Sequence, residues 1–251
     1  MGALVGVVLS VLGLCGPARI AHAQTLRVAS AANLQKVMTE AVIPAFQKQT
    51  GATVVPTFGS TKLLATQLQN GAPIDVFVAA DTETVAKLTA AGIVVPGTAR
   101  VYAIGKLVLW TRRDAKHHPR VIGDLASPVY AKIALANPAL APYGRAAQQS
   151  LAAAGLTARV SARLVQAENI GQALQYAQSG NADVALTALS LVVEDKTDPY
   201  VIVPDRLHAP IAQSAGLVAR SPQAALGAKF VAFLTSKDAA PIWKRYGYSL
   251  P

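Results

Sequence analysis

Apolar residues recur along the chain with two alternating periods, one typical of strands and one typical of helices. The short apolar run Leu26–Ala29 predicts a strand, and the apolar residues after it repeat at helical spacing until Gly51. The same order returns twice, with strands expected over 53–58 and 74–79, each followed by a helix that ends at a glycine. Strand–helix units joined by short links predict parallel strands with helices on both faces of the sheet.

A second group of such units follows a change of pattern. Residues 102–110 form one long apolar run, which we interpret as a strand that crosses into a second lobe. The second lobe is expected to alternate strands and helices over 132–136, 144–154, 163–166, 171–179 and 182–187. A returning apolar strand over 213–219 could pair with 102–110, and helices over 223–234 and 237–246 end the chain.

This order of elements predicts an α/β protein of two lobes, each a mostly parallel sheet flanked by helices, joined by two crossing hinge strands. Lobe I is expected to be discontinuous, with residues 24–112 plus 210–251, and lobe II to span 113–209. The carboxyl ends of both sheets would then face a shared cleft, where open α/β sheets bind their ligands.

The junctions between strands and helices are candidate binding positions. Ser60 lies where the strand over 53–58 leads into a helix, and the first turn of a helix leaves about four N–H groups unpaired at its positive end. An anion could bind there, although a serine before a helix is more often only a cap. Similar junctions at 30–33, 137–143 and 167–170 favour an anion site shared by four helix starts.

The first 23 residues predict a secretory signal peptide. The apolar run over 3–14 is followed by Ala21-His22-Ala23, which favours cleavage after Ala23 and export to the periplasm. The run is shorter than the roughly 18 residues that a membrane span needs. Cys15, the only cysteine, lies within this segment, and the bulky Leu14 before it argues against a lipid-modified cysteine.

The charge balance favours small anions over nucleic acids as ligands. Without residues 1–23 the chain has 228 residues, and the loss of Arg19 leaves 22 basic against 13 acidic groups, a formal charge of +9. This charge raises the local concentration of small anions. The basic residues are scattered rather than clustered with aromatic residues, so no nucleic-acid partner is expected. His117 and His118 are neighbours, but no third metal ligand stands at suitable spacing.

Seven stretches, taken in order, resemble the periplasmic molybdate-binding proteins of molybdate ABC transporters. They cover residues 28–34, 58–61, 70–81, 102–110, 137–144, 167–174 and 244–248. The resemblance implies a two-lobed periplasmic-binding-protein fold of type II that captures molybdate and tungstate and delivers them to a membrane permease. It also implies a monomer that is not an enzyme and has no cofactor, with molybdenum present only as the bound oxyanion.

The resemblance further implies which residues hold the oxyanion. In that family the anion is held by hydroxyl groups, by backbone N–H groups at helix starts and, in some members, by one side-chain amide. The corresponding positions in this chain are Ala32, Asn33, Ser60, Tyr143 and Ile170. Such donors suit a deprotonated tetrahedral dianion, which can only accept hydrogen bonds and is repelled by carboxylates.

The chain departs from the family pattern at two of these places. Asn33 stands where many members have Ser or Thr. Residues 186–189 read Leu-Thr-Ala-Leu, where some members have a Tyr that contacts the anion, so we expect this contact to be absent and Tyr143 to contribute differently.

Three charged residues near these junctions have open roles. Lys62 and Arg145 fall in the first turns of two of the helices, where a cation is unfavourable unless an anion is near, so they either sense the anion or extend into solvent. Glu168 is interpreted as a surface residue, because a carboxylate in the site would favour monohydrogen phosphate instead.

Other functions remain as alternatives. A binding protein for another tetrahedral oxyanion such as sulfate has the same features, because sequence does not measure the radius of the site. An enzyme on the same fold is less favoured, since the junctions offer no nucleophile–base pair and no paired carboxylates. A transcription regulator would need a DNA-binding helix-turn-helix where this chain has an apolar leader.

Overall fold

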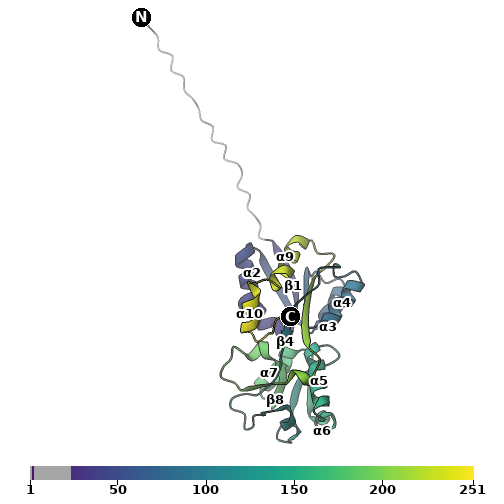
Figure 1. Ribbon diagram of the computed structural model, residues 1–251, viewed down its shortest axis with the longest axis vertical. Helices are drawn as coiled ribbons and strands as arrows, with labels where there is room; N and C mark the ends of the chain where they lie inside the picture. Colours follow the sequence, from purple (N-terminus) through teal and green to yellow (C-terminus); the bar gives the residue numbers. More distant parts are fainter. Residues whose placement is uncertain (1, 3–23) are drawn as a thin grey trace.

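Two five-stranded sheets form the framework of the computed structural model, which describes Gly2 and residues 24–251. Each sheet lies in its own lobe, and Figure 1 shows the two lobes one above the other. The expected signal peptide over 1–23, its cleavage after Ala23 and the interpretation of Cys15 lie, apart from Gly2, outside the described residues.

The first sheet has the strand order β2-β1-β3-β10-β4. Its strands are β1 (Thr25–Ala31), β2 (Thr53–Gly59), β3 (Val76–Ala79), β4 (Arg100–Gly105) and β10 (Ile211–Leu217). β1, β2 and β3 are parallel, whereas β10 runs antiparallel to its neighbours β3 and β4. Ala31 pairs with Gly59, so β1 and β2 end level with each other and start their helices side by side.

The second sheet repeats this plan with the order β7-β6-β8-β5-β9. Its strands are β5 (Leu107–Trp110), β6 (Ile133–Ala136), β7 (Leu164–Ala167), β8 (Val184–Ala188) and β9 (Tyr200–Ile202). β6, β7 and β8 are parallel, and β5 is antiparallel to both β8 and β9. Ala136 pairs with Ala167, so β6 and β7 also end level. The α/β prediction is confirmed, and each sheet is mixed: four strands run in one direction and one strand, β10 or β5, runs in the opposite direction.

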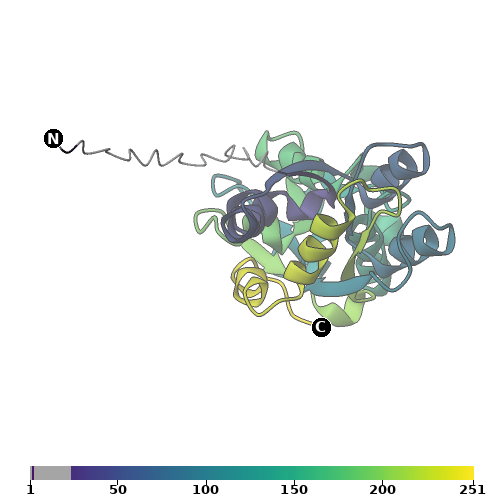
Figure 2. The same ribbon diagram turned by 90° about the horizontal axis from the view of Figure 1, so that it is seen from above.

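Helices cover both faces of the first sheet. They are η1 (Ala32–Leu34), α1 (Gln35–Val37), η2 (Met38–Val42), α2 (Ile43–Thr50), α3 (Thr61–Gln69), α4 (Thr82–Ala90), α9 (Ala224–Leu234) and α10 (Ala239–Arg245). In both views α2 and α10 lie on one side and α3 and α4 on the other (Figures 1 and 2). Phe46 of α2 meets Phe230 of α9 edge to face at 4.9 Å, while Leu64 and Leu88 belong to the core under α3 and α4.

The helices of the second lobe are shorter on average and flank its sheet in the same way. They are η3 (Ile122–Ala126), α5 (Pro142–Ala153), α6 (Thr157–Val160), η4 (Ser161–Arg163), α7 (Ile170–Gln178), α8 (Leu189–Val192) and η5 (Asp205–Leu207). Across the described part of the chain, no helix combines the length and the apolar character that crossing a membrane requires.

The first crossing between the lobes takes place at a single residue. The long strand expected over 102–110 is in fact two strands, because Lys106 separates β4 of the first sheet from β5 of the second. The change of sheet therefore comes six residues before the boundary expected after residue 112. Leu189 N–H donates to the Lys106 carbonyl at 3.0 Å, which anchors the crossing to the start of α8.

The second crossing is the segment between β9 and β10, not a strand that spans both lobes. β10 pairs with β4 as expected, but it stays within the first sheet. Val203 N–H donates to the Leu107 carbonyl at 2.9 Å, and Asp205 forms an ion pair with Lys106. The two crossings thus lie side by side and are joined to each other, as a hinge between two lobes requires.

We expect Gly144→Ala to destabilise the protein. A Cβ at Gly144 would overlap the carbonyl oxygen of Ala136 at the end of β6, so α5 would have to move away from the sheet. The free energy of unfolding should fall by about 1–3 kcal/mol, as for other overpacked sites. Chemical denaturation of the ligand-free protein measures this. Gly123→Ala is the control, because its Cβ would meet nothing nearer than 3.9 Å, and an equal loss in both variants would contradict the explanation.

Candidate functional site

A small cavity lies between the lobes at the level ends of the parallel strands. Its volume is about 10 Å³, close to the room that one water molecule occupies. It is lined by Ala31, Ala32, Asn33, Gly59, Ser60, Thr61, Ala80, Ala141, Pro142, Tyr143, Asn169 and Ile170. The five residues expected to hold the oxyanion, Ala32, Asn33, Ser60, Tyr143 and Ile170, are all among them, and they come from four helix starts in two lobes.

Ser60 precedes α3 but does not cap it. Its side chain makes no hydrogen bond to the first turn, and its Oγ is buried with no hydrogen-bond partner among the described residues. The expectation that Ser60 would act as a helix cap is therefore not met in this conformation. An unpartnered buried hydroxyl costs about 1–3 kcal/mol, so in this conformation the side chain of Ser60 does not stabilise α3.

Two neighbouring junctions show what a cap looks like in this protein. Asp81 Oδ1 accepts from Thr84 N–H at 2.9 Å before α4, and Asn169 Oδ1 accepts from Gln172 N–H at 3.0 Å before α7. Ser60 stands in the same position relative to its helix but leaves its oxygen unused. The contrast shows that the same position before a helix carries a side-chain cap at Asp81 and Asn169 and carries none at Ser60.

The first junction offers backbone donors rather than the side chain of Asn33. Asn33 is 1% exposed, and its Nδ2 donates to Gln213 Oε1 and to Tyr248 OH, each at 2.9 Å. A carboxamide nitrogen carries two hydrogens, so both are used within the protein. Ala32 and Asn33 can therefore offer a ligand only the backbone N–H groups at the start of η1.

Tyr143 is placed by the residues on either side of it. Pro142 opens α5 at the position where its missing N–H costs nothing, as expected from its place in the sequence. Gly144 lets the helix start approach the end of β6. The Tyr143 hydroxyl accepts from Gln213 Nε2 at 3.3 Å, and burial raises the pKa of Tyr143 well above its ordinary value, so the phenol keeps its proton.

Ile170 begins α7, so its contribution to the cavity is a first-turn N–H group at the positive end of the helix. Below it, Thr187 is fully buried and its hydroxyl donates to the Ile170 carbonyl at 3.4 Å. Thr187 is not among the residues that line the cavity. The strand that carries a tyrosine contact in some relatives thus supports α7 here from beneath.

No charged side chain lines this cavity. Arg145 turns instead to the opposite lobe, where it pairs with Asp81 Oδ2 at 2.9 Å and Glu83 Oε2 at 3.0 Å. This is neither of the two roles expected for it. Lys62 meets the second lobe through its backbone, with its N–H donating to the Leu140 carbonyl at 3.2 Å. Glu168 is exposed and lies outside the cavity, in agreement with its interpretation as a surface residue.

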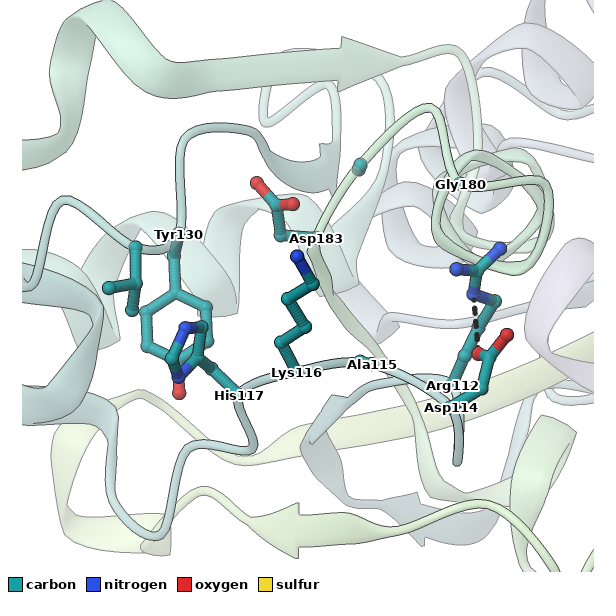
Figure 3. Close-up of a pocket in the computed structure, with 10 residues that line it drawn as sticks. Arg112, Asp114, Ala115, Lys116, His117, Tyr130, Gly180 and Asp183 are labelled. Carbon is teal, nitrogen blue, oxygen red and sulfur yellow. Dashed lines mark ion pairs between the residues drawn. The ribbon is translucent and has the colours of Figure 1, made fainter.

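A larger pocket of about 420 Å³ lies on the second lobe, away from the strand ends (Figure 3). Asp114 and Asp183 contribute carboxylates to it, and Arg112 is paired with Asp114 at 3.1 Å. His117 lines this pocket, while His118 is bonded to Thr111. Within the described residues, no group of three or more His, Cys, Asp or Glu side chains could hold a metal ion. The mixed charges of this pocket do not match a donor-only site.

The similarity of this chain to known proteins covers nearly its whole length. The family model described as bacterial extracellular solute-binding protein matches residues 26–249. The molybdate-binding protein ModA of Azotobacter vinelandii is 37% identical, with 92% of each chain covered, and that of Rhodobacter capsulatus is 34% identical, with 95% of this chain and 92% of the relative covered. The chain belongs to the bacterial extracellular solute-binding proteins.

The solved structures agree with this family. The periplasmic molybdate-binding protein of Azotobacter vinelandii superposes with a TM-score of 0.84 at 34% identity, covering 90% of this chain and 99% of that one. The prediction of a type II periplasmic-binding-protein fold is confirmed, as is the resemblance to the molybdate-binding members of the family. This solute-binding protein therefore shares its fold and its cleft with relatives that are named for binding, not for catalysis.

Sequence reasoning missed the polar residues behind the cavity of this solute-binding protein. Gln213, Tyr102 and Tyr248 are each buried and hydrogen-bonded to one another or to Asn33. Gln213 stood in the sequence as one polar residue at the start of an apolar strand, which is a weak signal. Its fully buried position and its partners appear only once β10 is placed beside β4.

We expect Ser60→Ala not to destabilise the ligand-free protein, because the described structure shows no hydrogen bond of this hydroxyl that would be lost. Asn169→Ala is the matched variant at another helix start, where the loss of a real cap should lower the free energy of unfolding by about 1 kcal/mol. Denaturant unfolding of both variants without ligand measures the difference. If Ser60→Ala costs as much as Asn169→Ala, then Ser60 acts as a cap in solution.

Proposed function

We propose that this protein captures molybdate, and also tungstate, between its lobes and delivers the oxyanion to the permease of an ABC transporter. The observation that carries the proposal is the composition of the interlobe cavity. Four helix starts meet there without a charged side chain, and the buried hydroxyl of Ser60 lacks a partner among the described residues.

The physics of a tetrahedral dianion supports this choice. Such an ion has only lone pairs to offer, so each protein group that touches it has to donate a hydrogen bond. Helix starts supply such donors together with a partial positive charge, and they do so without a counter-ion that would hold the cargo too tightly to release. A carboxylate in the cavity would favour a protonated anion such as monohydrogen phosphate, and the described lining contains none.

Relatives that are similar over nearly the whole chain support the identity of the anion. The two relatives described above are named molybdate-binding proteins, and the similar solved structure carries the same description. The chain is at least 34% identical to each of the three. We extend their ligand to this chain, with molybdate as cargo rather than as a resident cofactor.

The contacts across the cleft support capture by closure. Ser190 Oγ in α8 donates to the Asn33 carbonyl at 2.8 Å, and Lys62 N–H donates to Leu140. Arg145 adds ion pairs to Asp81 and Glu83 at the rim of the cleft. These groups can meet only when the lobes are together, so they favour the closed form around a bound anion.

The proposal also includes export of the protein to the periplasm. We infer that residues 1–23 direct export to the periplasm and are removed after Ala23, and that the exported protein acts as a monomer. Edman sequencing or intact mass of the protein recovered from the periplasm would locate the cleavage site.

Calorimetry with four anions tests the proposed ligand. Molybdate and tungstate should bind tightly, whereas sulfate should bind weakly because it is smaller, and phosphate weakly because it carries a proton that needs an acceptor. The titrations are carried out with the same preparation at one pH. Sulfate or phosphate binding as tightly as molybdate would replace the proposed specificity with general oxyanion binding.

Ser60→Ala should weaken molybdate binding by about 1–3 kcal/mol, because the buried anion loses one charge-assisted donor. Thr66→Ala is the control, since Thr66 lies on the exposed side of the same helix and bonds only to the Lys62 carbonyl. Both dissociation constants come from calorimetry. An unchanged value for Ser60→Ala would remove this hydroxyl from the site.

A further inference from the structure

Gln213 occupies a fully buried position directly behind the interlobe cavity. Its side chain is 0% exposed although it carries a polar carboxamide, and it lies in β10 where the pairing with β4 slips by one residue between Gln213 and Ser214. Such irregularities often re-aim a side chain near a functional site. A buried amide is costly unless its hydrogen bonds are satisfied, so its partners define its role.

The carboxamide of Gln213 connects the two lobes. Its Oε1 accepts from Asn33 Nδ2 at 2.9 Å and from the Tyr102 hydroxyl at 3.0 Å, while its Nε2 donates to the Tyr143 hydroxyl at 3.3 Å. Asn33 belongs to the first lobe and Tyr143 to the second. One side chain on a hinge-proximal strand thus holds a cavity residue from each lobe.

The recorded orientation of the Gln213 amide places its oxygen toward Asn33 Nδ2 and the Tyr102 hydroxyl and its nitrogen toward Tyr143. The single proton of Tyr102 has a second acceptor in the Ala79 carbonyl, at 3.1 Å. The observed orientation makes the Tyr143 oxygen an acceptor from Gln213. No hydrogen bond donated by the Tyr143 hydroxyl is found among the described residues, and this hydroxyl lies beside Gly105 and Gln213.

The contact between Tyr143 and Gln213 depends on a glycine in the neighbouring backbone. Gly105, the last residue of β4 before the crossing, faces both side chains, and a Cβ there would overlap the Tyr143 hydroxyl and approach Gln213 Nε2 to 2.7 Å. The contact between Tyr143 and Gln213 therefore forms at the hinge itself, where the two sheets separate.

We infer that Gln213 is a positioning residue for the oxyanion site: it holds Asn33 and Tyr143 in register when the lobes close and keeps the group behind the anion neutral. This inference rests on the proposed function. Gln213 does not line the cavity, so it acts through the two residues that do.

The decisive variant is Gln213→Glu, which keeps the shape of the side chain and makes it ionisable. A protonated Glu can accept from Asn33 and Tyr102 and donate to Tyr143, as Gln does. An ionised Glu has two acceptor oxygens, would draw the Tyr143 proton to itself and would repel the bound dianion. The variant should therefore bind molybdate well only at the acidic end of the range between pH 6 and 9.

The titratable groups around this position are phenols from three elements. Tyr102 of β4, Tyr143 of α5 and Tyr248 of the C-terminal segment are the titratable partners of Gln213 and Asn33. Burial raises the pKa of each of them above its ordinary value, so all three stay neutral between pH 6 and 9. A pH dependence of the molybdate dissociation constant that appears in the variant but not in the unmutated protein therefore arises from residue 213.

The experiment measures the dissociation constant of molybdate between pH 6 and 9 for the unmutated protein, Gln213→Glu, Gln213→Met and Gln149→Glu. Gln149 is exposed and adds the same charge at the rim of the cleft, outside the cavity. We expect the Gln213→Glu constant to rise by about tenfold or more across this range, and up to about tenfold per pH unit above the pKa of the new carboxyl. Gln213→Met should bind about tenfold more weakly at every pH, and the other two proteins should show flat profiles.

Thermal unfolding of each ligand-free variant at the same pH values separates positioning from stability. A merely structural role predicts lower unfolding temperatures with unchanged affinity in the folded protein, and that result overturns the inference. A flat affinity profile for Gln213→Glu, or tight binding by Gln213→Met, would also overturn the inference. If the unmutated protein does not bind molybdate, the proposed function fails and this inference fails with it; if it binds and the variants match it, only this inference fails.

Discussion

The crossing at Lys106 is the constraint on which the rest of the structure depends. One residue separates β4 from β5, so the two sheets cannot drift apart, and their parallel strands end toward a common space. Level pairing of β1 with β2 and of β6 with β7 then brings two helix starts from each lobe to that space. Four sets of unpaired N–H groups converge because the strands end together, without any long-range attraction between the helices themselves.

Charge is kept at the rim of the cleft and away from its centre. Asp81 and Glu83 meet Arg145 across the lobes, where water screens them, so these pairs add little free energy but fix how the lobes meet. The centre holds hydroxyls, amides and backbone N–H groups, whose dipoles can be arranged in advance of the ligand. A cavity built in this way distinguishes ions by their protonation and size, since it has no counter-charge that would attract every anion alike.

Much of this arrangement can be read from the sequence, because it depends on local patterns. Alternation of strand and helix periods predicted the parallel strands of both sheets and the four junctions, but not the short edge strand β9, and Pro142 marks a helix start by the same local chemistry. The hydrogen-bond partners of the side chains, in contrast, do not follow from such local patterns. The orientation of the Asn33 amide depends on residues more than a hundred positions away, Gln213 and Tyr248. The absence of a cap at Ser60 is likewise not visible in the sequence, where a serine before a helix predicts one. The crossing at Lys106 was also missed, because an apolar run does not reveal which of two sheets its halves join.

The unpartnered hydroxyl of Ser60 connects this geometry to the opening and closing of the lobes. In an open cleft water can reach the hydroxyl, whereas closure without a ligand buries it at a cost of about 1–3 kcal/mol. The Ser190 contact across the cleft and the Arg145 pairs at its rim form in the same closed arrangement. In the proposed function a bound anion removes the cost by accepting the hydrogen bond, and only such a difference in affinity between the two forms can shift the equilibrium toward closure.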